Sequence, residues 1–216
     1  MNLLQQTVTD ILVEQLRHEI IQGKLKPGDR LRLRDLADRF QVSTMPVREA
    51  LQILATEGLV SGAARRGATV TQLSAADLED IYELRATLEA LATRLAAPHV
   101  TPALLERLRQ ITDELDQYEA QGEMAKIIET NERFHETLYA IAGRKHLTEL
   151  ISTLRHRTAH YLHLRASLSG APLAHQDHYA IIAALQAGNP EQAATIMYDH
   201  IANAGRSIIA FLQPSM

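Results

Sequence analysis

The sequence predicts a mainly α-helical protein, with a small N-terminal domain of three helices and a β-hairpin over residues 1–73 and an antiparallel bundle of about six helices over residues 74–216. Three observations support this fold class. Aromatic residues make up only 4% of the chain, whereas helix-favouring alanine, leucine, glutamate, glutamine and arginine are plentiful. Apolar residues recur at helical spacing along most of the chain. Residues 59–70 are the exception, since they resemble two short strands around a basic turn.

The N-terminal elements follow from apolar spacing and from the residues that end helices. An apolar face predicts a first helix that stops near Gly23, and a Lys-Pro-Gly-Asp turn follows it. The third helix begins after Ser43 or Thr44, carries Pro46 in its first turn and ends at Gly58. Three helices and a small hairpin form the layout of a winged helix-turn-helix, which binds DNA. The predicted helices cover residues 8–21, 33–40 and 44–57, and the predicted strands cover residues 59–63 and 67–70.

The distribution of charge is uneven, although the net charge is −4. Residues 1–73 hold ten Lys and Arg and eight Asp and Glu, which gives +2, whereas residues 74–216 hold twelve and eighteen, which gives −6. Between Lys24 and Arg48, seven basic residues accompany three acidic ones. Local charge sets the field that a phosphate backbone meets, so the acidic chain as a whole does not exclude DNA binding. A solvated basic helix face is the alternative interpretation.

Five segments of the N-terminal part, at residues 20–31, 35–37, 42–51, 57–60 and 66–70, carry a specific resemblance. In order and spacing they resemble the DNA-binding domain of the GntR family of bacterial transcription regulators. The resemblance extends over most of the N-terminal domain, about residues 8–72, and is far more specific than a bare helix-turn-helix match. It implies that the partner of this domain is double-stranded operator DNA.

Within this resemblance, the first turn of the third helix is expected to enter the major groove. Thr44 takes the place of an arginine that reads guanine in many family members, and threonine cannot make that bidentate contact, so we expect an altered operator. The wing tip would enter the minor groove, where arginine is attracted by a narrow, negative channel. The alternative for Arg48 is a surface pair with Glu49 or Asp38. The expected DNA-contacting residues are Arg34, Ser43, Thr44, Met45, Arg48, Arg66 and Gly67.

The C-terminal part shows helical spacing throughout, punctuated by proline and glycine. Ser74, with Asp77 three residues later, is a typical helix start. An antiparallel bundle is the natural architecture for such a run of helices. The predicted helices cover residues 74–97, 101–120, 123–142, 146–168, 172–187 and 190–212.

A basic side chain interrupts the apolar face of the first bundle helix. Arg85 occupies a position of the apolar stripe, where a guanidinium is costly unless it meets an anion. Its partner is either an internal glutamate, such as Glu83 or Glu89, or the carboxylate of a bound ligand. The residues alone leave both alternatives open.

Three histidines also lie on apolar faces, each on a different helix of the bundle. His135 follows Asn131 by one helical turn, and His178 and His200 belong to the apolar stripes of the last two helices. A single histidine on such a face is usually a hydrogen-bonded core residue. Three of them suggest convergence on a metal ion, because neutral imidazole is a good metal ligand.

The segments 82–89, 131–135 and 177–178, together with His200, are similar to the FCD ligand-binding domain of the FadR-type subfamily of GntR regulators. The similarity covers about residues 74–210, with looser motifs than in the N-terminal half. It implies a divalent metal ion, zinc or nickel, that an Asp and three His hold beside the pocket of a small organic acid. By position, the metal ligands are Asn131, His135, His178 and His200, with Arg85 near the effector carboxylate.

The sequence departs from the family pattern at Asn131, where the acidic ligand stands in metal-containing members. An amide oxygen is a weaker ligand than a carboxylate, and three neutral imidazoles leave a divalent ion with its full charge. Either the site is poor in metal, or an anionic effector supplies the missing negative charge. We favour the second, because all three histidines are present.

We therefore expect a homodimeric transcription regulator, not an enzyme, that binds a two-fold operator with its recognition helices about one DNA turn apart. A carboxylate metabolite in the bundle would shift the pose of the DNA-binding domains and with it operator affinity. Release of DNA on effector binding, as by a repressor, is usual in the family. No apolar run approaches the roughly 18 residues of a membrane span, and no signal-peptide pattern is found. The absence of cysteine agrees with a cytoplasmic location.

Two other functions compete with this interpretation. A metal-dependent hydrolase would need a general base and an open coordination position, and the nearby Glu132 and Glu136 are both expected to face solvent. In a regulator whose C-terminal domain is metal-free and only dimerises, Arg85 and the histidines would be satisfied internally.

Overall fold

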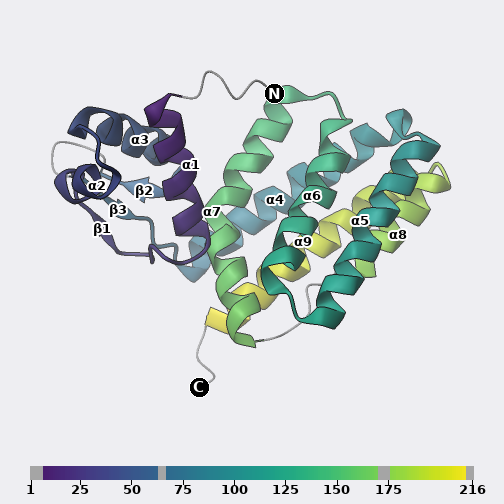
Figure 1. Ribbon diagram of the computed structural model, residues 1–216. Coiled ribbons are helices and arrows are strands. Elements are labelled where there is room, and N and C mark those ends of the chain that lie inside the picture. Colours follow the sequence, from purple (N-terminus) through teal and green to yellow (C-terminus); the bar gives the residue numbers. More distant parts are fainter. Residues whose placement is uncertain (1–6, 63–66, 170–175, 213–216) are drawn as a thin grey trace. The chain divides into compact units, whose positions relative to one another are not determined.

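The computed structural model is mainly helical and consists of two compact units (Figure 1). The first unit comprises Met1–Ser74 with His156–His163, and the second comprises Ala75–Arg155 with Leu164–Met216. The structure describes residues 7–62, 67–169 and 176–212.

The first unit has the element order of a winged helix-turn-helix. Its elements are α1 (Val8–Ile21), β1 (Arg30–Leu31), α2 (Leu33–Phe40), α3 (Thr44–Thr56), β2 (Val60–Ser61) and β3 (Ala68–Val70). α1 begins with a capping box, in which the Thr7 hydroxyl accepts from the backbone N–H of Asp10 and the Asp10 carboxylate accepts from the N–H of Thr7. Gln41 has left-handed backbone, at φ 55°, and provides the tight turn between α2 and α3.

One apolar core holds these helices together. α1 packs against α3, and α2 also packs against α3. Leu16 of α1 and Val47, Leu51 and Leu54 of α3 are fully buried in this core. Because α3 uses these positions for packing, its first turn and the exposed positions that follow are left at the surface.

The strands form an antiparallel sheet in the order β1-β3-β2, which corrects the expected two-stranded hairpin. In the additional pairing, Arg30 lies opposite Thr69 and Leu31 lies opposite Ala68. A strand of two residues is too short to show an alternating pattern, so β1 is defined by its partner strand and not by its own sequence.

Gly67 has a structural role at the start of β3. Its φ of +103° lies in a region that favours glycine, and a Cβ atom there would lie 2.1 Å from the backbone oxygen of Leu31. Glycine therefore permits the close approach of the wing to β1. Arg66, the other residue expected at the wing tip, lies outside the described residues.

The second unit is a helical bundle. It contains the helices α4 (Ala75–Ala96), α5 (Pro102–Gln121), α6 (Met124–Ala140), α7 (Lys145–Ser169), α8 (Gln176–Gln186) and α9 (Pro190–Leu212), except for residues 156–163 of α7, which belong to the first unit. α4 and α9 share the most extensive contact, α5 packs against α6 and α8, and α8 packs against α9 (Figure 1). None of the described helices combines the length and the hydropathy of a transmembrane segment.

The mainly α-helical fold class is confirmed, and the helices of the bundle begin and end close to the predicted residues. The structure adds a short 3-10 helix at Ala97–His99, directly after α4. It describes the fifth bundle helix from Gln176 onward, whereas the first predicted residues of that helix, 172–175, lie outside the described residues.

A glycine allows α4 and α9 to approach closely. A Cβ atom on Gly205 of α9 would lie 2.5 Å from Cγ and 2.6 Å from Cβ of Tyr82, which is on α4. These atoms are near the backbone of α4, so a rotation of the tyrosine side chain cannot move both of them away. The helix backbones would have to separate to accept any larger residue.

We expect the substitution Gly205→Val to destabilise the fold by about 2 kcal/mol, because overpacking a core contact typically costs about 1–3 kcal/mol and exceeds the small gain in helix propensity. The measurement is the free energy of unfolding in urea. Ala210→Ser, at an exposed position of the same helix, is the control and should change stability by less than about 0.5 kcal/mol. Equal stability of the two variants would contradict the close contact.

Candidate functional site

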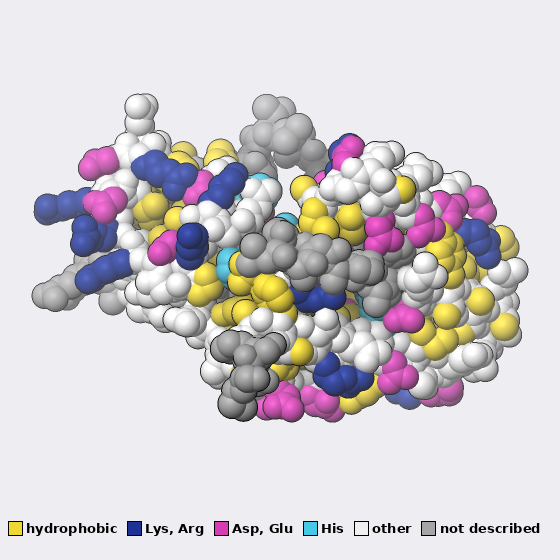
Figure 2. All heavy atoms as spheres, turned by 90° about the horizontal axis from the view of Figure 1, so that it is seen from below, with side chains coloured by type: hydrophobic (Ala, Val, Ile, Leu, Met, Phe, Trp, Pro, Cys, Tyr) yellow, Lys and Arg dark blue, Asp and Glu magenta, His cyan; other side chains and the backbone are white. Residues whose placement is uncertain are grey.

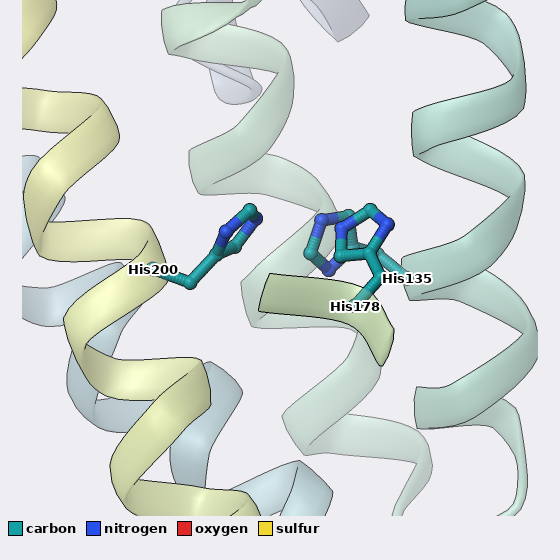
Figure 3. Close-up of side chains that lie close together, drawn as sticks. All are labelled: His135, His178 and His200. Carbon is teal, nitrogen blue, oxygen red and sulfur yellow. The ribbon is translucent and has the colours of Figure 1, made fainter. Parts of the chain in front are cut away.

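Three histidines from different helices come together inside the second unit (Figure 3). His135 on α6, His178 on α8 and His200 on α9 are 2%, 0% and 6% exposed. Each offers one ring nitrogen, and these nitrogens all lie within 4.8 Å of one another. The ring centroids are 5.1 Å apart for His135 and His178, 5.3 Å for His135 and His200, and 5.0 Å for His178 and His200. The structure thus brings together the three histidines that the sequence singled out.

Aromatic packing holds two of these rings in place. The His178 ring stacks on the ring of Phe134, with centroids 3.8 Å apart and an interplanar angle of 6°. Phe134 is fully buried and also forms a T-shaped pair with His135, its neighbour on α6, with ring centroids 5.5 Å apart. A buried aromatic ring therefore restricts the orientation of both imidazoles.

A chain of hydrogen bonds connects His135 to α4. The His135 Nδ1 atom lies 3.0 Å from the Tyr139 hydroxyl, which donates to Oε2 of Glu89 at 2.7 Å. The other oxygen of Glu89, Oε1, accepts from Nε of Arg85 at 2.8 Å. All four residues are buried, so their polar atoms find their hydrogen-bond partners in one another and not in water.

His200 has an outer partner as well. Its Nδ1 atom lies 3.2 Å from Oδ2 of Asp177, a partly exposed carboxylate at the start of α8. A carboxylate on one nitrogen of an imidazole orients the ring and raises the basicity of the other nitrogen, an arrangement that is common around protein-bound metals.

The electrostatic environment keeps His135 neutral. Burial lowers the pKa of His135 well below its ordinary value, and repulsion from Arg155, from a protonated His178 or His200 and from Arg85 lowers it further. Burial also raises the pKa of the Tyr139 hydroxyl, with a further contribution from the Glu89 carboxylate. Arg85 stays charged, because Glu89 raises its pKa against the opposing effect of burial.

The donor set fits a divalent transition metal. Neutral imidazole nitrogen is a good ligand for zinc and nickel, and three such nitrogens lie close together here. His200 already has a carboxylate at its other nitrogen, as metal-binding histidines usually do. A site with three protein ligands leaves a coordination position for water or an exogenous anion.

The remaining residues of the predicted site are placed as follows. α6 carries Asn131 one turn before His135, with a half-buried side chain, and its role as a ligand stays a prediction. Arg85 pairs with Glu89, one of the two internal glutamates that the sequence suggested. The other, Glu83, accepts a hydrogen bond from Tyr198. Contact between Arg85 and an effector stays a prediction.

Sequence reasoning missed three residues of this site. Tyr139 follows His135 by one helical turn, so the spacing places it on the same face, but it resembles an ordinary core residue. Asp177 directly precedes His178, yet it contacts His200. Arg155 on α7 influences the pKa of His135, and no pattern in the sequence distinguishes it.

Glu132 departs from its expected position. It was expected to face solvent, but its side chain is half-buried, whereas Glu136 is exposed as expected. Burial raises the pKa of Glu132, and nearby Arg155 opposes this shift. The rotation of α6 explains the difference, because Glu132 is three residues from His135 and so lies partly on the buried face.

The first unit exposes five of the seven residues that the sequence assigned to DNA. Arg34, Ser43, Thr44 and Arg48 are exposed, and Met45 is 68% exposed although it is apolar. Among the described residues, neither Arg34 nor Arg48 forms an ion pair. Glu49, one of the two acidic residues expected to pair with Arg48 if it does not contact DNA, accepts a hydrogen bond from the Thr9 hydroxyl at 2.9 Å. Lys and Arg side chains gather at the surface of this unit (Figure 2).

The beginning of α3 is suited to an anionic partner. Ser43 is the N-cap residue, and its hydroxyl makes no capping hydrogen bond. The backbone N–H groups of a first helical turn have no partner within the helix, and the helix dipole makes this end positive. A DNA phosphate or a base edge can use these groups together with the hydroxyls of Ser43 and Thr44.

Comparisons with known proteins agree with both units. Residues 9–70 match the family of bacterial regulatory proteins of the gntR type, and residues 80–203 match the FCD domain. The HTH-type transcriptional regulator McbR of Escherichia coli (strain K12) is 33% identical over 179 residues, 82% of this chain and 81% of McbR. The HTH-type transcriptional regulator LutR of Bacillus subtilis (strain 168) is 32% identical over 206 residues, 85% of this chain and 93% of LutR.

A solved structure supports the same assignment over nearly the whole chain. The structure of E. coli McbR/YncC superimposes with a TM-score of 0.83 at 28% sequence identity, and the match covers 96% of this chain and 99% of that one. The relatives and the fold are those of transcription regulators and not of enzymes. The chain therefore belongs to the GntR family, as a transcription regulator with an N-terminal GntR DNA-binding domain and a C-terminal FCD domain.

Proposed function

We propose that this regulator binds a two-fold operator as a homodimer and that a small carboxylate metabolite, bound beside a divalent metal ion in the FCD domain, controls its affinity for DNA. The observation that carries the proposal is the group of three buried imidazoles whose nitrogens lie within 4.8 Å of one another. Buried polar side chains are costly, and three of them together are best explained by a ligand that they share.

The balance of charge supports an anionic effector. The imidazoles are neutral ligands, and Asn131, if it also binds the metal, adds no charge. The guanidinium of Arg85 is balanced by Glu89, so Glu89 does not compensate the metal ion in addition. Arg155 adds a further positive charge near His135. A bound carboxylate would supply the negative charge that these residues leave out, with Arg85 close to it.

The part of the proposal that concerns DNA binding rests on the exposed residues at the beginning of α3. In this proposal Ser43, Thr44 and Met45 contact base edges, Arg48 contacts DNA one turn further along, and Arg34 contacts the backbone. Thr44 cannot make a bidentate contact with guanine, so the operator differs from those of relatives with arginine there. Arg66 and Gly67 complete the interface at the wing.

Coupling between the effector site and the DNA-binding domains requires that the effector bind more tightly to one arrangement of the dimer than to the other. We propose that the effector favours the arrangement with low operator affinity, so that the protein acts as a repressor in the cytoplasm. This direction follows the usual behaviour of the family.

The test is elemental analysis combined with native mass spectrometry of the protein as purified. We expect a dimer mass, about one zinc or nickel ion per chain, and added mass from an organic acid that is lost on denaturation. Thermal unfolding should then shift upward with metal, and further with metal and acid together. No metal in the purified protein and no thermal shift with zinc or nickel would favour the alternative, a metal-free domain used only for dimerisation.

The substitution Asn131→Asp is expected to raise the affinity for zinc and to lower the affinity for the acid, each by on the order of tenfold, because a carboxylate near the ion supplies the charge that the acid otherwise brings. Calorimetric titration with zinc, and then with the acid, measures both. Asn203→Asp adds the same charge at an exposed position of α9 and is the control. If neither affinity changes in Asn131→Asp, residue 131 does not contact the ion.

A further inference from the structure

The hydroxyl of Tyr139 has one proton and three possible acceptors. Glu89 Oε2 lies at 2.7 Å, His135 Nδ1 at 3.0 Å and the sulfur of Met197 at 3.3 Å. A hydrogen bond to an ionised carboxylate is roughly twice as strong as one between neutral groups, and a thioether is a weak acceptor. Glu89 forms a buried ion pair with Arg85 through its other oxygen, so its Oε2 is the strongest acceptor within reach of the Tyr139 hydroxyl. The proton of Tyr139 therefore points to Glu89.

This direction determines which nitrogen of His135 carries the proton. With its own proton committed to Glu89, the phenolic oxygen can only accept from His135. An Nδ1 atom with a bare lone pair would face another lone pair at 3.0 Å, in a buried place where neither could find water. An Nδ1–H instead completes the chain, and every hydrogen bond in it then has one donor and one acceptor.

We propose that Glu89, acting through Tyr139, is a positioning residue that fixes neutral His135 as the tautomer with the proton on Nδ1 and leaves Nε2 as the nitrogen that binds the metal ion. The tautomer follows from the hydrogen bonds alone, whereas the role of Nε2 rests on the metal site of the proposed function. Arg85 supports the same arrangement, because its guanidinium is a donor only and binds Oε1 of Glu89, which leaves Oε2 to accept from Tyr139.

His200 is oriented in a similar way by a shorter route. Its Nδ1 faces the carboxylate of Asp177 at 3.2 Å, and a carboxylate is an acceptor only, so a neutral His200 also carries its proton on Nδ1. Two of the three histidines therefore offer Nε2 to a shared ion. One is oriented by a carboxylate directly, and the other by a carboxylate through a tyrosine.

Nitrogen NMR of the metal-free protein tests the tautomer without reference to metal. In ¹⁵N-labelled protein, long-range ¹H–¹⁵N correlations distinguish a protonated from a bare ring nitrogen. We expect wild-type His135 to show Nδ1 protonated and Nε2 bare. The opposite pattern in the wild type would overturn the proposal.

Two variants test the role of the chain. Tyr139→Phe removes the acceptor, so His135 should no longer be held in the Nδ1–H form, and zinc affinity should fall by about 10- to 100-fold, as is typical when an outer partner of a metal ligand is lost.

Glu89→Gln should reverse the direction of the hydrogen bonds between residue 89, Tyr139 and His135. The amide oxygen accepts from Arg85, the amide NH₂ donates to Tyr139, and the tyrosine proton turns to Nδ1, which leaves the proton of His135 on Nε2. A residue with a merely structural role would not move that proton.

Tyr179→Phe is the matched control. This tyrosine is on α8, and its hydroxyl contacts Asp113 and Asp116. The control should leave both the tautomer of His135 and the affinity for zinc unchanged. An unchanged tautomer in both Tyr139→Phe and Glu89→Gln would contradict the positioning role. A wild-type protein with the expected tautomer that binds no zinc would instead refute the metal site of the proposed function, and the role of Nε2 with it, but not the tautomer.

Discussion

Replacing His200 by alanine is expected to lower the affinity for zinc by more than about 100-fold, because loss of an outer partner alone typically costs about 10- to 100-fold and His200 would be a direct ligand. The site would keep two imidazoles, which hold an ion far less firmly than three. His200 is 6% exposed, and its Nδ1 atom faces the carboxylate of Asp177. Removal of the imidazole therefore also deprives that carboxylate of its partner. Competition with a chromophoric zinc chelator measures the affinity.

The control for this experiment is His146→Ala. The His146 side chain is 94% exposed, and the polar partner found for it among the described residues is Glu149, one turn further along α7. The substitution removes a histidine from the same domain and leaves the three buried histidines intact. Zinc affinity should therefore stay within twofold of the wild-type value. Equal zinc binding by wild type and His200→Ala, with the fold intact by circular dichroism, would show that the three histidines are a packed core and not a metal site.

Arg48→Ala is expected to weaken binding to operator DNA by about 10- to 100-fold, which corresponds to the roughly 1–3 kcal/mol of one good arginine contact. Arg48 is exposed on α3, and no described residue forms an ion pair with it, so its removal should cost the fold little. The operator can be obtained by selecting bound duplexes from a random-sequence library with the wild-type protein. Fluorescence anisotropy at fixed salt then gives the affinity.

Arg107→Ala, at an exposed position of α5, is the matched control and should leave operator affinity unchanged. The salt dependence distinguishes two contacts at Arg48. If the arginine contacts a phosphate, the slope of log affinity against log salt falls by about one and all sequences lose affinity alike, whereas a base contact relaxes specificity at one position. An affinity equal to that of the wild type would remove Arg48 from the interface.

The sequence predicts the helices well because the residues at and next to each helix end determine where the helix begins and ends. α1 covers the predicted residues, since its apolar face ends where Gly23 breaks the pattern. β1 could not be predicted, because two residues become a strand only when β3 lies beside them. Local signals therefore define the helices, and tertiary pairing defines the third strand.

In the site, too, local patterns predict some features, whereas others depend on packing between helices. Three histidines on apolar stripes predict convergence, because a polar residue on a buried face needs a partner. The partners themselves come from packing between helices. Tyr139 contacts Glu89 of α4, and Asp177 contacts the histidine on α9 and not its neighbour in sequence. No spacing within one helix indicates which residue of another helix will face it.

The glycine at position 205 affects more than the spacing of two helices. The ring of Tyr82 occupies the volume that a side chain on Gly205 would fill, and the guanidinium of Arg85 lies 4.7 Å above the centre of that ring. A methyl group added at position 205 would force α9 and α4 apart, and this would displace the ring of Tyr82 relative to α9 together with the cation that lies above it. A glycine on α9 thus helps to set the position of the buried guanidinium of Arg85, and with it the alignment of the carboxylate of Glu89.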